Sequence, residues 1–149
     1  STYAYDPQIG HASPGSMRLA GPFDRRLVHW NIVPAPDRPI TLTCWVKTER
    51  LSGCTVTLSL AFFGPDTWLV TSCFATSGSP GEIEKGWTTI RDCGRVPNGT
   101  TDWTQVTATL AADEIPAGVS KAAFVVDVKG GGEGQIWLDD LDLWQPAEP

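Results

Sequence analysis

Residues 40–48 read ITLTCWVKT, and apolar and polar side chains alternate along them. Leu42, Cys44 and Val46 share one face of this run, and Trp45 lies on the other face among threonine and lysine. Because successive side chains of a β-strand point to opposite faces, such alternation is typical of a strand with one buried face. The run therefore predicts a strand whose outward face carries Trp45.

The rest of the chain repeats this pattern between turn sequences rich in Gly, Pro, Asn and Ser. The other predicted strands lie at residues 15–21, 25–33, 54–63, 67–75, 87–96, 102–110, 121–130 and 135–144. Short strands at this spacing, with no significant helix, predict an all-β fold: a two-sheet antiparallel β-sandwich (jelly roll) of about nine strands. We expect one domain over residues 1–145, followed by a linker or tail at residues 146–149.

The net charge is -6, and the lysines and arginines form no stripe. Since nucleic acids and anionic membranes attract basic surfaces, this balance argues against both as partners. No apolar run approaches the ~20 residues that span a bilayer. The chain begins at Ser1 without a Met or a signal peptide, so we expect a mature or excised fragment. We expect it to be a monomer.

The sequence contains four cysteines, Cys44, Cys54, Cys73 and Cys93, and no CxxC pair. An even count in a compact β-protein favours two disulfides and a secreted, extracellular origin. Three connectivities are possible. We favour Cys44–Cys54 and Cys73–Cys93, because each pair falls on consecutive predicted strands. The alternative is that the cysteines are buried free thiols.

Four segments of the chain form a recognisable series: IGHASPGSMRLAG, VPAPDRPITLTCWVKT, DWTQVTATLAADEIPAG and GEGQIWLDDLDLW. In this order they resemble the carbohydrate-binding modules of families four, nine, sixteen and twenty-two. The first strand usual in those modules is missing before Ser1, and the cysteines are not typical of them. The resemblance implies a jelly-roll module that binds a plant-type polysaccharide such as xylan or a β-glucan. It also implies a covalently linked catalytic domain, a glycoside-degrading enzyme that the module targets to its substrate.

The closing strand carries an Asp139-Asp140 pair within an apolar run. The resemblance implies that this pair marks a structural Ca²⁺ site, with carbonyls from the HASPGS turn and Asp6 as a possible further ligand. A metal would neutralise acids that are otherwise costly near a core. The alternative is that these acids point outward at a sheet edge, where charge prevents aggregation.

Sugar rings stack their C–H faces on aromatic rings, and their hydroxyls need directed polar partners. Trp45 is the first candidate, because it lies opposite the predicted core face and the resemblance assigns stacking to it. Asp127, which interrupts an apolar strand, and Arg26, four residues before Trp30, match ligand-binding positions of the resembling modules. Weaker carbohydrate-binding candidates are Trp68, Trp87, Arg91 and Gln105. We expect Trp30, Trp103, Trp137 and Trp144 to be packing residues.

Two other functions stay open. One is a structural or interaction domain that binds no sugar and packs against the catalytic domain of a secreted enzyme. The other, less favoured, is a jelly-roll glycosidase or lyase. A glycosidase needs two facing carboxylates about 5–9 Å apart, and the six glutamates all fall in predicted turns or the tail. We therefore expect no enzymatic activity.

Overall fold

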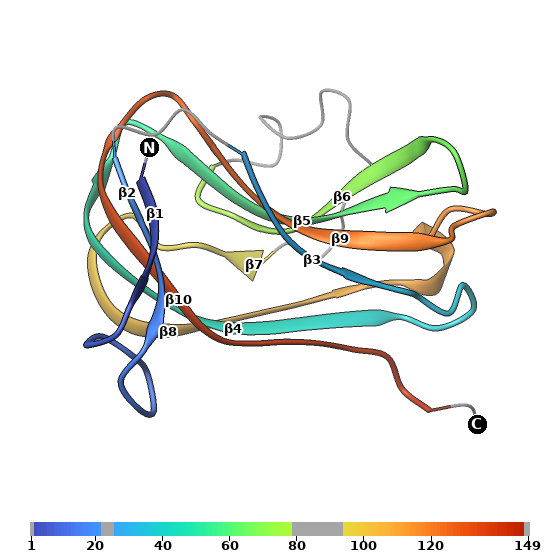
Figure 1. Cartoon of the computed structure of the whole chain (residues 1–149), viewed down its shortest axis with the longest axis horizontal. Helices are drawn as coiled ribbons and strands as arrows, with labels where there is room; N and C mark the ends of the chain where they lie inside the picture. Colours follow the sequence, from blue (N-terminus) through green and yellow to red (C-terminus); the bar gives the residue numbers. More distant parts are fainter. Residues whose placement is uncertain (1, 22–25, 79–93, 148–149) are drawn as a thin grey trace.

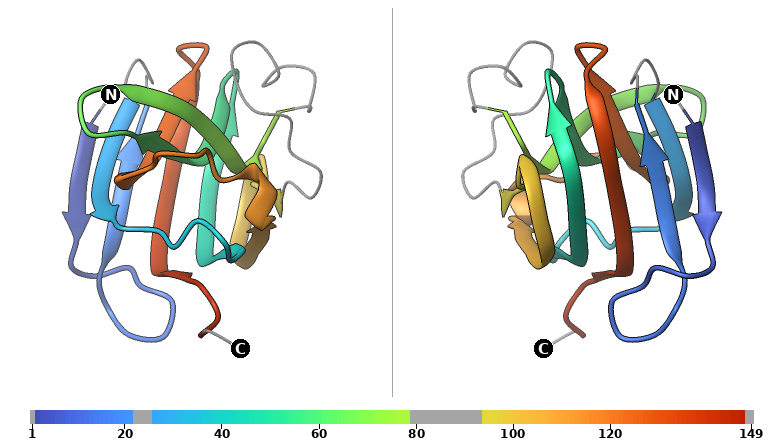
Figure 2. Two further views of the ribbon diagram at one scale, coloured as in Figure 1. Left: turned by 90° about the vertical axis from the view of Figure 1, so that its right-hand side faces the viewer. Right: turned by 90° about the vertical axis from the view of Figure 1, so that its left-hand side faces the viewer.

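The computed structural model describes residues 2–21, 26–78 and 94–147, whose strands form two packed sheets (Figure 1). The first sheet has the order β1-β2-β10-β4-β8. Its strands are Thr2–Asp6, Ser16–Ala20, Glu133–Trp144, Ile40–Ser52 and Gly99–Leu110 in that order. In Figure 2 these strands follow one another across the molecule from β1 at one edge to β8 at the other.

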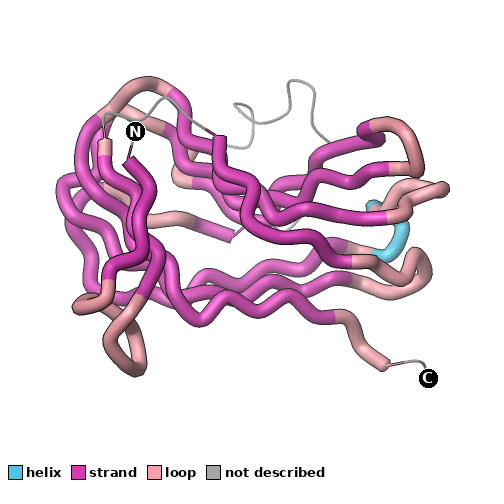
Figure 3. The backbone as a smooth tube through the Cα atoms, in the orientation of Figure 1, coloured by secondary structure: helices cyan, strands magenta, loops and turns pink. Residues whose placement is uncertain are grey.

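The second sheet has the order β3-β9-β5-β6-β7. Its strands are Arg26–Ile32, Lys121–Lys129, Thr55–Phe63, Trp68–Thr76 and Gly94–Arg95 in that order. The predicted all-β sandwich is confirmed. In the described ranges the helix is limited to a 3-10 turn, η1 (Ala112–Glu114), drawn in cyan in Figure 3. None of the described residues forms a helix long and apolar enough to cross a membrane.

Two features of the sheets differ from expectation. Thr2–Asp6 forms an edge strand, β1, that pairs antiparallel with β2, whereas the sequence predicted the first strand only at residue 15. The short β7 pairs with β6 in parallel, so the second sheet is not wholly antiparallel. Of the strand predicted at 87–96, residues 87–93 lie outside the described ranges.

The core lies between the two sheets, where side chains from alternate positions meet. On β4 the predicted face is buried, with Leu42 at 0%, Cys44 at 1% and Val46 at 0% exposure. On β5 the expected face is buried too, but Thr57 and Ser59 on the opposite face are at 5% and 0%. The outer side of the second sheet is therefore covered along β5, whereas the outer side of the first sheet is more open.

Candidate functional site

His11 covers the aromatic residues on the outer face of the first sheet. It lies in the loop between β1 and β2, and its ring stacks on Trp45 with centroids 3.8 Å apart and planes 14° apart. Trp103 meets the same imidazole edge-on at 5.9 Å. Gln105 is exposed on β8, directly across from Trp45 on β4. Trp45 stays a predicted sugar contact, but a histidine occupies one face of its ring.

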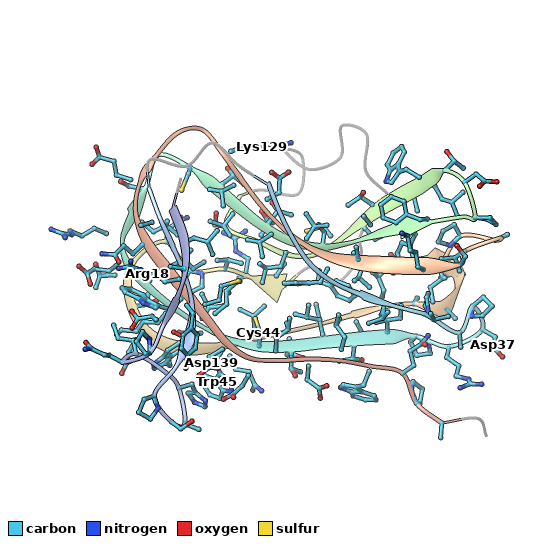
Figure 4. The ribbon with its side chains drawn as sticks, viewed as in Figure 1. Arg18, Asp37, Cys44, Trp45, Lys129 and Asp139 are labelled. Carbon is cyan, nitrogen blue, oxygen red and sulfur yellow. The ribbon has the colours of Figure 1, made fainter. Side chains whose placement is uncertain are left out.

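The Asp139-Asp140 pair is also engaged by His11. The His11 backbone N–H donates to Asp139 Oδ2 at 2.8 Å, and the Asp140 N–H donates to Asp139 Oδ1 at 2.8 Å. His11 Nδ1 lies 2.8 Å from Asp140 Oδ2, where a ring N–H can donate to the carboxylate. Figure 4 shows Asp139 and Trp45 close together below β4 in that view. N–H donors thus stabilise the acids that sit in this apolar strand.

A register shift separates Asp139 from Asp142, and Asp140 adopts a positive φ of 50°. β10 pairs with β2 only from Gln135 to Leu138. From Asp139 onward β4 is therefore its only partner among the described strands, and His11 of the β1–β2 loop contacts the acids at the other edge. The bulge points Asp140 toward His11.

Asp6, the third predicted metal ligand, has hydrogen-bond partners of its own. Its Oδ1 accepts the backbone N–H groups of Gln8 and Ile9 at 3.0 and 3.2 Å. Its Oδ2 accepts the Trp137 indole N–H at 3.1 Å. The Gln8 hydrogen bond, and then that from Trp137, hold the pKa of the Asp6 carboxyl below its usual range.

These residues do not form a metal centre as they stand. Within the described ranges, no three His, Cys, Asp or Glu side chains gather into a group that could hold a metal ion. Ca²⁺ takes roughly six to eight oxygen ligands, whereas the oxygens of Asp139 and Asp6 already accept N–H groups. Calcium therefore stays a prediction.

Arg26, Asp127 and Trp68, three further predicted sugar contacts, lie on the second sheet, on the opposite side of the sandwich. Backbone register places Arg26 of β3 beside Asp127 of β9, and Asp127 beside Thr57 of β5. Asp127 is 6% exposed, and its Oδ2 lies 3.8 Å from Lys129 Nζ. Two residues 101 positions apart in the chain thus become neighbours (127 − 26 = 101).

Trp68 opens β6 on this second sheet and is 51% exposed. Its indole N–H donates to Thr71 Oγ1 at 3.0 Å, which fixes the ring. Across the strands it faces Phe63, and Lys121 Nζ lies 5.4 Å from the centre of the Phe63 ring. An aromatic and basic cluster, Phe63, Trp68 and Lys121, therefore marks one end of the sheet.

The remaining sequence candidates and the packing tryptophans are only partly accounted for. Trp87 and Arg91 lie outside the described residues, as does Cys93, and the Arg26 and Trp30 side chains are not described. Trp137, at 3% exposure, is confirmed as a packing residue, whereas the same prediction for Trp144 is wrong because it is 48% exposed. Sequence reasoning missed His11 as a partner of Trp45, since nothing local ties a loop histidine to β4.

The predicted Cys44–Cys54 disulfide is wrong, because both residues carry free thiols. β4 continues to Ser52 rather than ending near residue 48. About 25 Å of strand therefore separates Cys44 from the turn that holds Cys54, whereas disulfide Cα atoms lie within about 7 Å. Burial raises the pKa of the Cys44 thiol to about 12 and also raises the pKa of Cys54. The Cys73–Cys93 pairing stays a prediction.

No protein-family model matches the sequence, and no curated protein matches it. Solved structures do match. A family 30 carbohydrate-binding module has a TM-score of 0.60 at 14% identity, covering 99% of this chain and 76% of its own. The CBM22-2 xylan-binding domain of Paenibacillus barcinonensis Xyn10C has 0.57 at 12% identity, covering 97% and 87%.

The enzymatically active domain of tailspike protein 4 from bacteriophage CBA120 also matches, with a TM-score of 0.60 at 15% identity. The match covers 97% of this chain but only 18% of the tailspike chain. These likenesses establish a shared fold. The expectation from the sequence is confirmed at that level: the chain has the β-sandwich fold of carbohydrate-binding modules.

Proposed function

We propose that the protein is a non-catalytic carbohydrate-binding module that holds polysaccharide at the exposed end of its second sheet, around Trp68. The observation that carries the proposal is Trp68, half exposed and fixed by its hydrogen bond to Thr71. A rigid exposed indole presents a flat apolar face on which a sugar ring can stack at little entropic cost. Trp45 is a weaker platform, because His11 already stacks on it.

A charged group at the start of β9 supports the same surface. Lys121 is exposed and lies beside Phe63, which pairs with Trp68, whereas Asp127, farther along the strand, is only 6% exposed. Charged side chains can pair with sugar hydroxyls as donors and acceptors.

The ligand we propose is a plant-type polysaccharide, either xylan or a β-glucan. The support is the shared fold together with the name of one structural neighbour, a xylan-binding domain. We further propose that the module is secreted and linked to a glycoside-degrading enzyme. Tethering would raise the enzyme's local concentration on its substrate without any new catalytic group.

Native affinity electrophoresis against soluble xylan, mixed-linkage β-glucan and mannan tests the proposal. We expect one or more of these glycans to retard the wild type, with a Kd between about 1 μM and 1 mM. Trp68→Ala should weaken binding tenfold or more, equivalent to about 1.4 kcal/mol. Trp144→Ala is the matched control, because Trp144 has similar exposure but lies on the first sheet.

The possible outcomes separate the candidate functions. Retardation lost in Trp45→Ala but kept in Trp68→Ala would move the site to the first sheet. No retardation by any glycan would contradict the proposal and favour a structural domain that packs against a neighbour. Release of reducing ends from the same glycans would instead indicate a glycosidase or lyase.

A further inference from the structure

A polar hollow of about 470 Å³ opens on the first sheet, where β2, β10 and β4 lie side by side. Its volume falls in the range of small-molecule sites, roughly 300–1,000 Å³. Six of its lining residues carry the argument: Arg18, Glu49, Arg50, Glu133, Gly134 and Gln135. Figure 4 shows Arg18 apart from Trp45 and Asp139, toward the left end of that view.

Irregular pairing shapes the hollow. The register of β10 and β4 shifts between Glu133 and Gln135, and Arg50 adopts a positive φ of 50°. A Cβ on Gly134 would lie 2.4 Å from the Arg50 carbonyl oxygen, so only glycine fits there. The Gly21 N–H donates to the Gly134 carbonyl at 2.9 Å, and this hydrogen bond holds the end of β2 against β10. Bulges of this kind re-aim side chains and are enriched beside functional sites.

The charges in the hollow are balanced. Two arginines face two glutamates, and Arg50 Nη2 lies 3.3 Å from Glu49 Oε1. Arg18 Nη1 lies 3.4 Å from Gln135 Oε1, and the Arg18 charge also acts on the Asp6 carboxylate. A guanidinium carries five N–H donors, so most of those on Arg18 are open to a ligand. Glu133 has no hydrogen bond or ion pair to another described residue and supplies acceptors.

This lining selects for one class of ligand. The glutamates would repel an anion and the arginines would repel a cation, so the hollow favours a neutral molecule. A hydroxyl group donates and accepts at once, and pairs of adjacent hydroxyls match the planar forks of Arg and Glu. None of the described lining residues is aromatic, so these residues would recognise a ligand by hydrogen bonds.

We propose that the hollow binds a single neutral sugar residue, as a second site independent of the surface around Trp68. Arg18 and Gln135 donate to its hydroxyls, and Glu133 accepts from them. The two sites lie on opposite sheets. The module would thus hold a chain on one side and a sugar ring, such as a chain end, on the other.

Titration of the ¹⁵N-labelled protein with D-xylose, D-glucose and D-galactose tests the second site by NMR. We expect saturable shifts of the Ala20, Gly21 and Gly134 amides with at least one sugar. Arg18→Leu and the milder Gln135→Ala should each weaken this binding tenfold or more. Trp68→Ala should leave it unchanged, and Arg18→Leu should leave polysaccharide retardation unchanged.

Three results would overturn the second site. The first is no saturable shift of these amides with any of the sugars. The second is binding that persists in both variants while their other amide resonances match the wild type. The third is tighter binding of D-glucuronate than of D-glucose, because the hollow would then select an anion. None of these results bears on the Trp68 surface, so the two proposals fail separately.

Discussion

His11 joins three elements of the first sheet through one side chain. It stacks on Trp45, meets Trp103 edge-on, and contacts the acidic pair of β10. Such a residue holds the β1–β2 loop against the sheet. Whatever the ligand, the aromatic surface of the first sheet depends on whether this loop stays in place.

His11→Ala should lower the free energy of unfolding by about 1–2 kcal/mol, because it removes an aromatic pair and a charge-assisted hydrogen bond. Urea denaturation followed by tryptophan fluorescence measures the loss. His11→Phe is the matched variant, since it keeps the stack without the ring N–H and should lose less. Equal urea midpoints for wild type and His11→Ala would contradict the stacking role.

Asp6 makes stability depend on pH in the acid range. Its carboxylate is stabilised in the folded state, so its folded pKa lies below the unfolded value of about 3.9. The stabilisation is fully present above the unfolded pKa and is lost as the pH falls through the folded pKa. We expect the Tm of the wild type to fall more steeply below about pH 4 than that of Asp6→Asn.

Thermal melts from pH 2 to pH 6 measure this difference. Asp66→Asn is the control, because Asp66 is exposed in the turn before β6. Its Tm curve should parallel that of the wild type. Parallel curves for Asp6→Asn and the wild type would show that the Gln8 and Trp137 hydrogen bonds do not favour the ionised form.

At the scale of elements, β10 depends on its two irregularities. One, at Gly134, shapes the polar hollow, and the other, at Asp140, turns an acid toward His11. Between them, Ile136 and Leu138 keep strict alternation into the core. The strand therefore packs like an ordinary member of the sheet while its ends carry the polar features.

Gly134→Ala should destabilise the fold by about 3 kcal/mol or more, since it combines a positive φ with a close backbone contact. Gly99→Ala is the matched control, because Gly99 has a φ of +75° but nothing within 4 Å of a Cβ. That variant should lose only about 1–2 kcal/mol. Chemical denaturation ranks the two, and equal losses would contradict the steric argument.

The predicted Ca²⁺ site also lies on β10, and thermal melts test it. If the sequence-based prediction holds, millimolar Ca²⁺ should raise the Tm above its value in EDTA, and Asp139→Asn should abolish the rise. At a Ca²⁺ concentration about 100 times Kd, the gain is about 2.7 kcal/mol. An unchanged wild-type Tm would contradict calcium, and the N–H donors around Asp139 would then suffice to stabilise the acids.

At the scale of the whole molecule, the thiols of Cys44 and Cys54 should react with reagents through different opening motions. Cys44 is at 1% exposure in the core, whereas Cys54 is half-buried in the turn after β4. We expect iodoacetamide to label Cys54 in the native protein and Cys44 only when the whole sandwich opens. Peptide mass spectrometry at rising urea concentrations follows both. Rapid native labelling of Cys44, or no labelling of either thiol after unfolding, would contradict these assignments.

The sequence alone determined most of the described strands and their buried faces, although not β1, because alternation is a local rule. Alternation with a period of two placed Leu42, Cys44 and Val46 inside and Trp45 outside, and the structure agrees. The alternation did not predict where each strand ends. β4 runs four residues past the predicted residue 48, and that extension separates Cys44 from Cys54.

Only the tertiary structure decided which of these residues meet. Asp127 lies beside Arg26 because β3 and β9 pair in one register, and His11 reaches Trp45 because a loop folds over a distant strand. Neither contact can be predicted from the sequence on either side of these residues. Long-range register and loop placement depend on the packing of the whole chain, so the proposed sites on opposite faces could be separated only in three dimensions.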